Sequence, residues 1–393
     1  MKHHRFRPDR RQFLRAVAAA PLAPAVLPGR PPQGGKGIEL DRATGTWHVH
    51  PGASIQEALE AAAAEPGHKR VLVHAGTYRP TARGQALVWF NRRHDGITLE
   101  AAGDVTLTAA NPDVADRRAP SFPAIVNHVV YFGDGISPRT VLRGFRITGA
   151  NGFAMGSGQR SPIESDEVRK TLYFFADGGG IKIYARSYPT IERVEIVDNY
   201  ASPCAGGVSV EHLGQNTQAA VFRDCIFRGN RTQVTGSALD VLHGSAAVVE
   251  NCLFVGNVSN LGVDYVGMLT GGEIHPEHGS GALTVFQGSR VVVRRCTFTD
   301  NWNGVDDIGD GSEYADCIFW RNTAQGGISP GERYEFDITD ASGVVGNFIH
   351  GAINDRRGTI DRSRNTFDPP DPRFDDRFVP RAPEYANVGY RPV

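Results

Sequence analysis

Short apolar runs alternate with glycine-rich or polar turns along most of this chain, and two units recur. One reads Phe-x-x-Asn and occurs at 227–230, 254–257, 298–301 and 319–322, with Ile-Val-Asp-Asn at 196–199 as a variant. The Asn residues follow one another at intervals of 31, 27, 44 and 21 residues. The other unit is a Gly- or Ala-rich strand entry at 179–181, 206–208, 237–239 and 281–283. Such recurrence predicts stacked coils of short strands and turns rather than long helices.

The stacking distance explains the repeated residue types. Coils that lie about 4.8 Å apart place each residue above its counterpart in the next coil. Inward Phe and Ile then build a core, and an Asn at a turn can bond the next Asn while tolerating left-handed dihedral angles. Each Phe also follows a Cys by two residues, which predicts a buried file of free thiols at Cys225, Cys252, Cys296 and Cys317, with Cys204 outside it.

The two ends of the repeat region carry different signals. Ser54 and Glu57 are placed as an N-cap pair that opens a helix with an apolar face at Ile55, Ala58, Leu59 and Ala62. A strand is expected at 71–78, which reads Val-Leu-Val-His-Ala-Gly-Thr-Tyr. The tail 366–393 is rich in Pro and Asp at its start and is expected to wrap the last coil as a cap.

A helix followed by Val-Leu-Val-x-x-Gly-Thr-Tyr resembles the entry cap of pectin- and pectate-lyase-like β-helices, and the repeats resemble those of bacterial surface β-helix proteins. The resemblance implies an all-β fold, a single-stranded right-handed parallel β-helix over 47–365 with a short N-terminal capping helix. It extends over roughly 45–350 and is specific for fold rather than function. Residues 26–46 are expected to be a linker.

Residues 1–25 resemble a twin-arginine export signal. Arg10 and Arg11 precede Phe13-Leu14-Arg15, an Ala-rich run follows, and 23–25 reads Ala-Pro-Ala. We expect export by the twin-arginine machinery to a periplasmic or extracellular location, and no segment long and apolar enough to span a membrane. Residues 1–25 hold six basic residues and one acidic residue, so 36 basic and 42 acidic residues remain, a net charge of −6. That sign argues against a general nucleic-acid binder.

Polar residues between the inward positions of the entry strands form the first candidate site. Alternation sends them outward onto neighbouring coils of one surface. The predicted catalytic set is Lys182, Tyr184, Glu211, His212, Asp240 and His243. Lys182, His212 or His243 could neutralise charge or act as a base, and Tyr184, Glu211 or Asp240 could act as an acid. A plain solvated face remains the alternative.

Two further clusters are candidate sites. The insertion 258–279 carries candidate substrate-binding residues Asp264, Tyr265, Glu273, His275 and His278. Clustered acids with glycines at 306–313 suit Ca²⁺, with Asp306, Asp310 and Glu313 as the expected ligands. By alternation Asp307 should point inward, so it needs either a bulge or a compensating partner.

Two functions fit this sequence. The first is an exported, monomeric polysaccharide lyase or glycoside hydrolase acting on an extended, possibly acidic glycan. The second is a non-catalytic surface or glycan-binding β-helix. The acid pairs and Gly-His-Gly signature of polygalacturonases and the catalytic Arg pattern of pectate lyases are absent, so the resemblance assigns no catalytic residue here.

Overall fold

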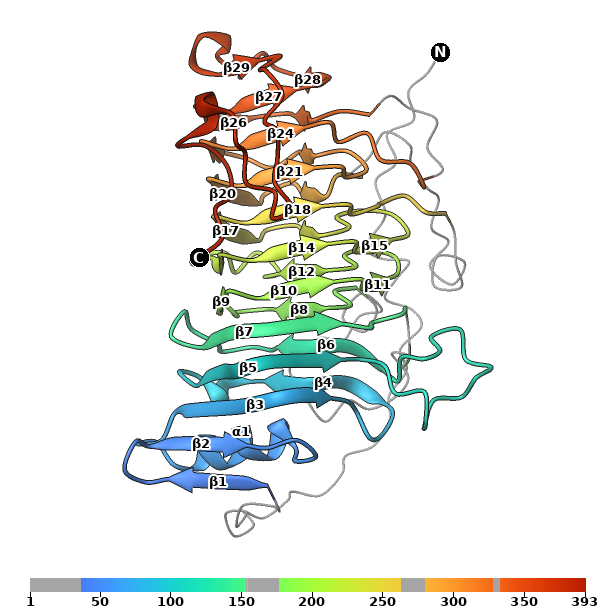
Figure 1. The fold of residues 1–393 in the computed structure, drawn as a ribbon, viewed down its shortest axis with the longest axis vertical. Helices are drawn as coiled ribbons and strands as arrows, with labels where there is room; N and C mark the ends of the chain where they lie inside the picture. The colour runs from blue at the N-terminus through green and yellow to red at the C-terminus, as the bar shows by residue number, and fades with distance from the viewer. Residues whose placement is uncertain (1–36, 153, 155–176, 263–279, 328–332) are drawn as a thin grey trace. The chain divides into compact units, whose positions relative to one another are not determined.

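Parallel strands from successive coils lie directly beside one another in this computed structural model, which describes residues 37–152, 154, 177–262, 280–327 and 333–393 (Figure 1). Each coil adds one strand to a nine-stranded sheet, named sheet B. In spatial order it contains β4 (Gly84–Phe90), β6 (Val126–Phe132), β8 (Ile181–Tyr184), β12 (Val208–Glu211), β16 (Leu239–Val241), β19 (Leu283–Val285), β22 (Val305–Asp307), β25 (Phe336–Ile338) and β28 (Ile353–Asp355).

The other side of each coil belongs to an eighteen-stranded sheet, named sheet A. It begins with β1 (Ile38–Asp41), β2 (Thr46–Val49), β3 (Arg70–Tyr78), β5 (Thr98–Thr108) and β7 (Val141–Thr148). It then divides into two series. The first is β9 (Thr190–Glu192), β13 (Ala220–Arg223), β17 (Ala246–Glu250), β20 (Arg290–Arg294), β23 (Ser312–Ala315) and β26 (Ala341–Val345). The second is β10 (Glu195–Val197), β14 (Ile226–Arg228), β18 (Leu253–Val255), β21 (Thr297–Thr299), β24 (Ile318–Trp320), β27 (Phe348–His350) and β29 (Thr366–Phe367).

The smaller elements sit at corners and ends. Strands β11 (Tyr200–Ala201) and β15 (Arg231–Thr232) form a separate two-stranded sheet, and each follows a strand of sheet A and precedes a strand of sheet B along the chain. Short 3-10 helices occur at Arg92–His94, Arg362–Arg364 and Pro383–Tyr385. Helix α1 (Ile55–Ala64) has Ser54 as its N-cap and buries the predicted apolar face. The fold is therefore a right-handed parallel β-helix, the hand that nearly all parallel crossover connections take. No helix among the described residues is both long and apolar enough to cross a membrane.

The interior confirms the predicted files of like side chains. Four Phe rings stack at centroid distances of 4.3–4.9 Å, namely Phe227, Phe254, Phe298 and Phe319. Five Asn side chains bond one another in sequence from Asn199 to Asn322. The four Cys residues are buried free thiols, and each backbone N–H of one donates to the Sγ of the next at 3.4 Å.

One detail of the turn prediction is wrong. The left-handed backbone falls on the residue before each ladder Asn, for example Asp198, Asp300 and Arg321 with φ of 53–55°, and not on the Asn. The residue before each Cys is also left-handed, as at Asp224 and Arg295. The chain therefore bends one residue earlier, which leaves the Asn side chain free to point inward and reach the neighbouring coils.

The predicted inward position of Asp307 is confirmed. Asp307 lies in register between Val285 and Ile338 and is fully buried. Its carboxylate accepts hydrogen bonds from the Tyr314 hydroxyl at 2.7 Å and from the Gly309 N–H at 2.8 Å. Burial raises the pKa of this carboxyl despite those two donors. The charge is thus compensated in place, and no bulge is needed.

Both ends of the β-helix differ from expectation. The predicted linker 26–46 contains β1, which pairs antiparallel with β2 and extends sheet A by one strand. The C-terminal tail folds back along the outside of sheet A rather than only covering the last coil (Figure 1). Its Tyr390 N–H donates to Thr297 Oγ1, and Asn251 exchanges two hydrogen bonds with the Arg391 backbone.

Opposite charges alternate along the outer face of sheet A. Glu and Arg occupy one register position in six successive coils, and sequence analysis did not single out these residues. They are Glu100, Arg143, Glu192, Arg223, Glu250 and Arg294. Neighbours approach to between 2.6 and 3.9 Å from Glu100 as far as Glu250. We name these six residues the ion column of sheet A.

Candidate functional site

A file of mostly polar side chains runs along the outer face of sheet B. The register places nine residues above one another, at the positions that alternation predicts to face outward. They are Trp89, Tyr131, Lys182, Ser209, Asp240, Thr284, Asp306, Asp337 and Asn354. From Tyr131 to Asp337 every one is buried. The prediction of one outward column is confirmed, and its centre is buried rather than solvated.

Lys182 is enclosed by acceptors. Its Nζ donates to both oxygens of Asp177 at 2.9 Å, to Ser209 Oγ at 3.1 Å and to Glu211 Oε2 at 2.7 Å. Burial alone would lower the pKa of Lys182, but Asp177 and Glu211 together raise it. This side chain therefore stays charged and fully bonded, so it is a poor base and has little capacity left to neutralise a substrate. The predicted role of Lys182 is wrong for that reason.

Asp240 is the acid at the centre of the column. Its side chain is fully buried, and Oδ2 accepts a hydrogen bond from Thr235 Oγ1 at 2.9 Å. Within the described part of the chain, no group hydrogen-bonds to its other oxygen, Oδ1. Burial raises the pKa of Asp240 to about 8. With this pKa the carboxyl keeps its proton at neutral pH, and Oδ1 can carry that proton while Oδ2 accepts from Thr235.

The backbone fits closely around Asp240. A Cβ placed on Gly236 would lie 2.5 Å from the Asp240 Cβ, and Gly236 has a φ of +60°. Only glycine satisfies both conditions without strain. The 235–240 turn thus presses the Asp240 side chain into position while Thr235 fixes one of its oxygens.

Two further acids follow Asp240 in the column. Asp306 is separated from Asp240 by Thr284, and its Oδ2 accepts a hydrogen bond from Tyr334 Oη at 2.9 Å. Asp337 lies in register beside Asp306 and accepts a two-pronged hydrogen bond from Arg356 at 2.6 and 2.7 Å. Asp240 and Asp306 are therefore two carboxyls on alternate strands of one sheet.

The remaining predicted catalytic residues have other roles. Both ring nitrogens of buried His212 are used by the backbone, with Nε2 2.8 Å from Ser187 O and Nδ1 3.2 Å from Ala246 N. Burial also lowers the pKa of His212 to about 4, so the prediction of a base there is wrong. Tyr184 is buried with Tyr131. His243 is exposed in the turn after β16, with its ring 4.9 Å from Phe286.

The other two predicted clusters gain no support. Asp264, Tyr265, Glu273, His275 and His278 lie outside the described residues. The three expected calcium ligands belong to different places: Asp306 to sheet B, Asp310 to an exposed turn, and Glu313 to sheet A, where it pairs with Arg294 at 3.3 Å. Over the described ranges, no group of three or more acid, His or Cys side chains is arranged to hold a metal ion.

Sequence analysis missed the residues that surround the column from other segments. Asp177 and Thr235 each precede their column residue by five positions, and Tyr334 precedes Asp337 by three. Asp337 itself had a signal. Leu239-Asp240-Val241 and Phe336-Asp337-Ile338 share an apolar-Asp-apolar pattern that places Asp outward in both strands.

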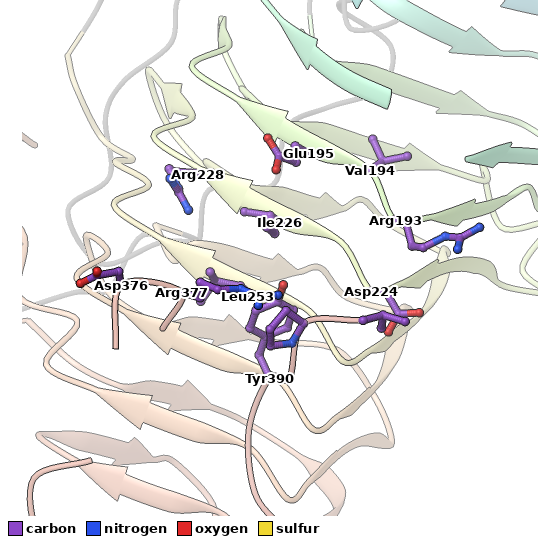
Figure 2. Close-up of a pocket in the computed structure, with 12 residues that line it drawn as sticks. Arg193, Val194, Glu195, Asp224, Ile226, Arg228, Leu253, Asp376, Arg377 and Tyr390 are labelled. Atoms are coloured by element: carbon purple, nitrogen blue, oxygen red, sulfur yellow. The ribbon is translucent and has the colours of Figure 1, made fainter. Parts of the chain in front are cut away.

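Cavities on the described surface include one beside each sheet. One of about 360 Å³ lies between the C-terminal tail and the outer face of sheet A, and Figure 2 shows Glu195, Arg228, Arg377 and Tyr390 around it. The charged side chains that line it include Glu195, which Arg146 already pairs at 2.9 Å. The second cavity, of about 510 Å³, is lined by residues that follow the strands of sheet B: Gln287, Ile308, Asp310, Thr339, Arg356 and Arg357.

No protein-family model matches the chain. No curated protein sequence matches it. Among solved structures, the chain is similar to pectate lyase Pel9A, with 17% identity, a TM-score of 0.30, and coverage of 77% of this chain and 76% of that one. It is also similar to the catalytic domain of GH87 α-1,3-glucanase in complex with tetrasaccharides, with 10% identity, a TM-score of 0.28, and coverage of 82% and 68%.

Proposed function

We propose that this chain is a carbohydrate-active enzyme, a glycoside hydrolase that cleaves an extended, uncharged glycan on the outer face of sheet B. Asp240 is the general acid, and Asp306 is the carboxylate that activates water. The observation that carries this proposal is the fully buried Asp240 carboxyl, whose Oδ1 has no hydrogen-bond partner among the residues that the structure describes. A buried carboxyl that keeps its proton at neutral pH is the group that protonates a leaving sugar oxygen.

The reaction balances with these two residues. Asp240 and Asp306 are buried, so this reaction requires that the glycan and water gain access to both carboxyls. Asp240 Oδ1 then gives its proton to the glycosidic oxygen as the bond to the anomeric carbon breaks. A water molecule attacks that carbon, and Asp306 takes the proton that the water releases. The Tyr334 hydroxyl, 2.9 Å from Asp306 Oδ2, orients the accepting carboxylate. Proton exchange with solvent then restores both side chains.

The estimated Cα separation of the two acids lies just above the range of carboxyl separations in inverting enzymes and far above that of retaining enzymes, so inversion is the expected outcome. Asp240 and Asp306 occupy alternate strands of sheet B, so their Cα atoms are about 9.6 Å apart at the usual strand separation. A separation of roughly 6.5–9.5 Å between carboxyl groups leaves room for a water molecule, whereas about 5 Å suits a covalent intermediate.

Charge argues against a lyase acting on a uronic acid. Among the described residues of the column and the side chains bonded to it, acidic residues outnumber basic ones. The acids are Asp177, Glu211, Asp240, Asp306 and Asp337, and the cations are Lys182 and Arg356. Even with Asp240 protonated, two negative charges remain. Such a surface repels a polyuronate and leaves no free cation to neutralise its carboxylates, so a neutral glycan is the better substrate class.

An assay on two matched panels tests this function. Purified protein is incubated with neutral α- and β-glucans and with polygalacturonate and alginate. We expect new reducing ends from a neutral glycan, no rise in unsaturated-uronate absorbance, and the inverted anomer in early proton NMR spectra. Binding without release of sugar from any polymer would instead favour the non-catalytic glycan-binding protein. Release of unsaturated uronate would overturn the assignment to hydrolysis.

We also propose that residues 1–25 direct export in folded form. The support is the Arg10-Arg11 motif followed by an Ala-rich run. Cell fractionation of the full chain and of its Arg10→Lys, Arg11→Lys variant measures this, since the variant should stay in the cytoplasm.

A further inference from the structure

The second cavity is lined by Gln287, Ile308, Asp310, Thr339, Arg356 and Arg357, and Ile308 and Asp310 belong to the coil that carries Asp306. Three of these residues extend the backbone hydrogen bonding of sheet B past the ends of its strands. Ile308 N–H donates to Val285 O, Thr339 N–H to Asp307 O, and Arg356 N–H to Ile338 O. With Gln287, which follows β19, the cavity wall spans four coils, each about 4.8 Å from the next.

Arg356 connects this cavity to the column. Its Nε and Nη2 are held by Asp337, which lies in register beside Asp306. Asp337 and, at longer range, Asp306 raise the pKa of Arg356. The Asp337 side chain is only 8% exposed, whereas that of Arg356 is 47% exposed. One edge of the guanidinium is thus fixed by a buried acid, and the other edge presents N–H donors to the cavity.

The cavity has the composition of a site for hydroxyl groups. Arg356 forms an ion pair with Asp337, and Arg357 forms one with Asp340 at 2.9 Å. Asp310 is the remaining charged residue of the cavity lining. Such a balance does not favour an anion. Planar guanidinium, amide and carboxylate groups can each bond vicinal hydroxyls, and Ile308 supplies an apolar contact for the C–H face of a sugar ring.

We propose that this cavity is a subsite for uncharged sugar rings, in which Arg357, Gln287 and Thr339 bind hydroxyls several rings away from the bond cleaved at Asp240. The inference rests on the proposed function for the direction of the glycan, but binding at the cavity does not require catalysis. Its volume of about 510 Å³ falls within the usual range for small-molecule sites.

The closing experiment uses the full chain and measures binding and turnover separately. Calorimetry follows titration with neutral gluco-oligosaccharides of two to eight units, of α-1,3, α-1,4, β-1,3 and β-1,4 linkage, and with galacturonate oligomers of the same lengths. Arg357→Ala should weaken binding of the longer neutral oligomers about tenfold, the loss of one charge-assisted hydrogen bond, and leave dimers unchanged. Where turnover is measurable, KM should rise for long substrates while kcat stays the same.

A matched control separates the cavity from a general surface effect. Arg139 forms a similar exposed pair with Asp95 at 3.1 Å and lies at the start of the coil that contains β7. Arg139→Ala should bind all oligomers like the unaltered protein. Tighter binding of galacturonate than of neutral oligomers, or equal affinity of Arg357→Ala and the unaltered protein for every oligomer, would overturn the subsite. A length-dependent loss of binding without any hydrolysis would keep the subsite and remove the proposed function.

Discussion

The two outer faces of this β-helix treat charge in opposite ways. In the ion column of sheet A, each Arg stands between Glu residues of the coils on either side, and the side chains are 19–51% exposed. In sheet B the charges lie inside the protein, and acids outnumber cations. The first arrangement costs little because water and partners satisfy every charge. The second is unfavourable for stability, and unfavourable buried carboxyls concentrate at functional sites.

Lys182 and Arg223 make the comparison specific. Each is a cation between two carboxylates, at 2.7 and 2.9 Å for Lys182 and at 3.3 and 3.9 Å for Arg223. Lys182 is fully buried, and the Arg223 side chain is 45% exposed. A cation between two carboxylates thus neutralises buried acids in sheet B, and in sheet A it helps to keep neighbouring coils in register. Burial, rather than the identity of the residues, decides which.

The largest expected effect is on catalysis. Asp240→Asn keeps the shape of the side chain and removes its acidic proton, so kcat on the cleaved neutral glycan should fall about a thousandfold. Asp306→Asn should cause a loss of similar size because no base then accepts the proton of water. Initial rates of reducing-sugar release measure both.

Glu192→Gln is the matched control for these two substitutions, since it changes one carboxyl in the ion column of sheet A. Its kcat should equal that of the unaltered protein. Residual activity above about a tenth in Asp240→Asn would remove Asp240 from the role of general acid.

The next effect is on stability. Lys182→Met leaves Asp177 and Glu211 buried without their cation, which should cost about 3–5 kcal/mol of the free energy of unfolding. Arg223→Met, in the exposed column, should cost less than about 1 kcal/mol. Urea unfolding at pH 7 compares the two. Similar losses in both variants would contradict the distinction between the two faces.

A smaller effect depends on pH and arises from Asp240 alone. The folded protein holds the Asp240 proton up to about pH 8, whereas the unfolded chain releases it near pH 4. The stability that this proton contributes is fully present below about pH 4 and is lost as the pH rises toward 8. Asp240→Asn does not titrate, so its melting temperature relative to the unaltered protein should rise by about 5 °C or more between pH 4 and pH 8.

Thermal unfolding of both proteins at several pH values checks this prediction. A constant difference in melting temperature would mean that Asp240 has an ordinary pKa in the folded state, and its assignment as the acid would then lose its basis.

The sequence was sufficient for the stacked files because they follow from local rules. Strand alternation and equal coil spacing predicted the Phe stack, the Cys file and the outward placement of Lys182 and Asp240. The ion column could also have been predicted, since the residues two positions before Cys225, Cys252 and Cys296 alternate as Arg, Glu and Arg.

The burial of the sheet B column could not be predicted in this way. It depends on Asp177, Thr235 and Tyr334, which reach the column from the segments before each strand. Asp177 and Thr235 share a spacing of five residues from the column, but none of the three lies on a strand, so alternation does not predict where their side chains point. Without these partners, Lys182 appeared to be a free cation and His212 a free base. The pairing of Asp240 with Asp306 was likewise hidden, because Asp306 was grouped with its neighbours in sequence as a metal ligand.

The smallest effect concerns the response of the two faces to salt. The charges of Arg223 and its partners face water, so dissolved ions screen them over about 3 Å at 1 M ionic strength. The stability lost in Arg223→Met should therefore vanish when urea unfolding is repeated in 1 M NaCl. The loss in Lys182→Met should persist, because ions do not enter the buried site where Asp177 and Glu211 would remain. If salt removed both losses equally, the charges around Lys182 would be screened like those around Arg223, and burial would not explain the difference between the two faces.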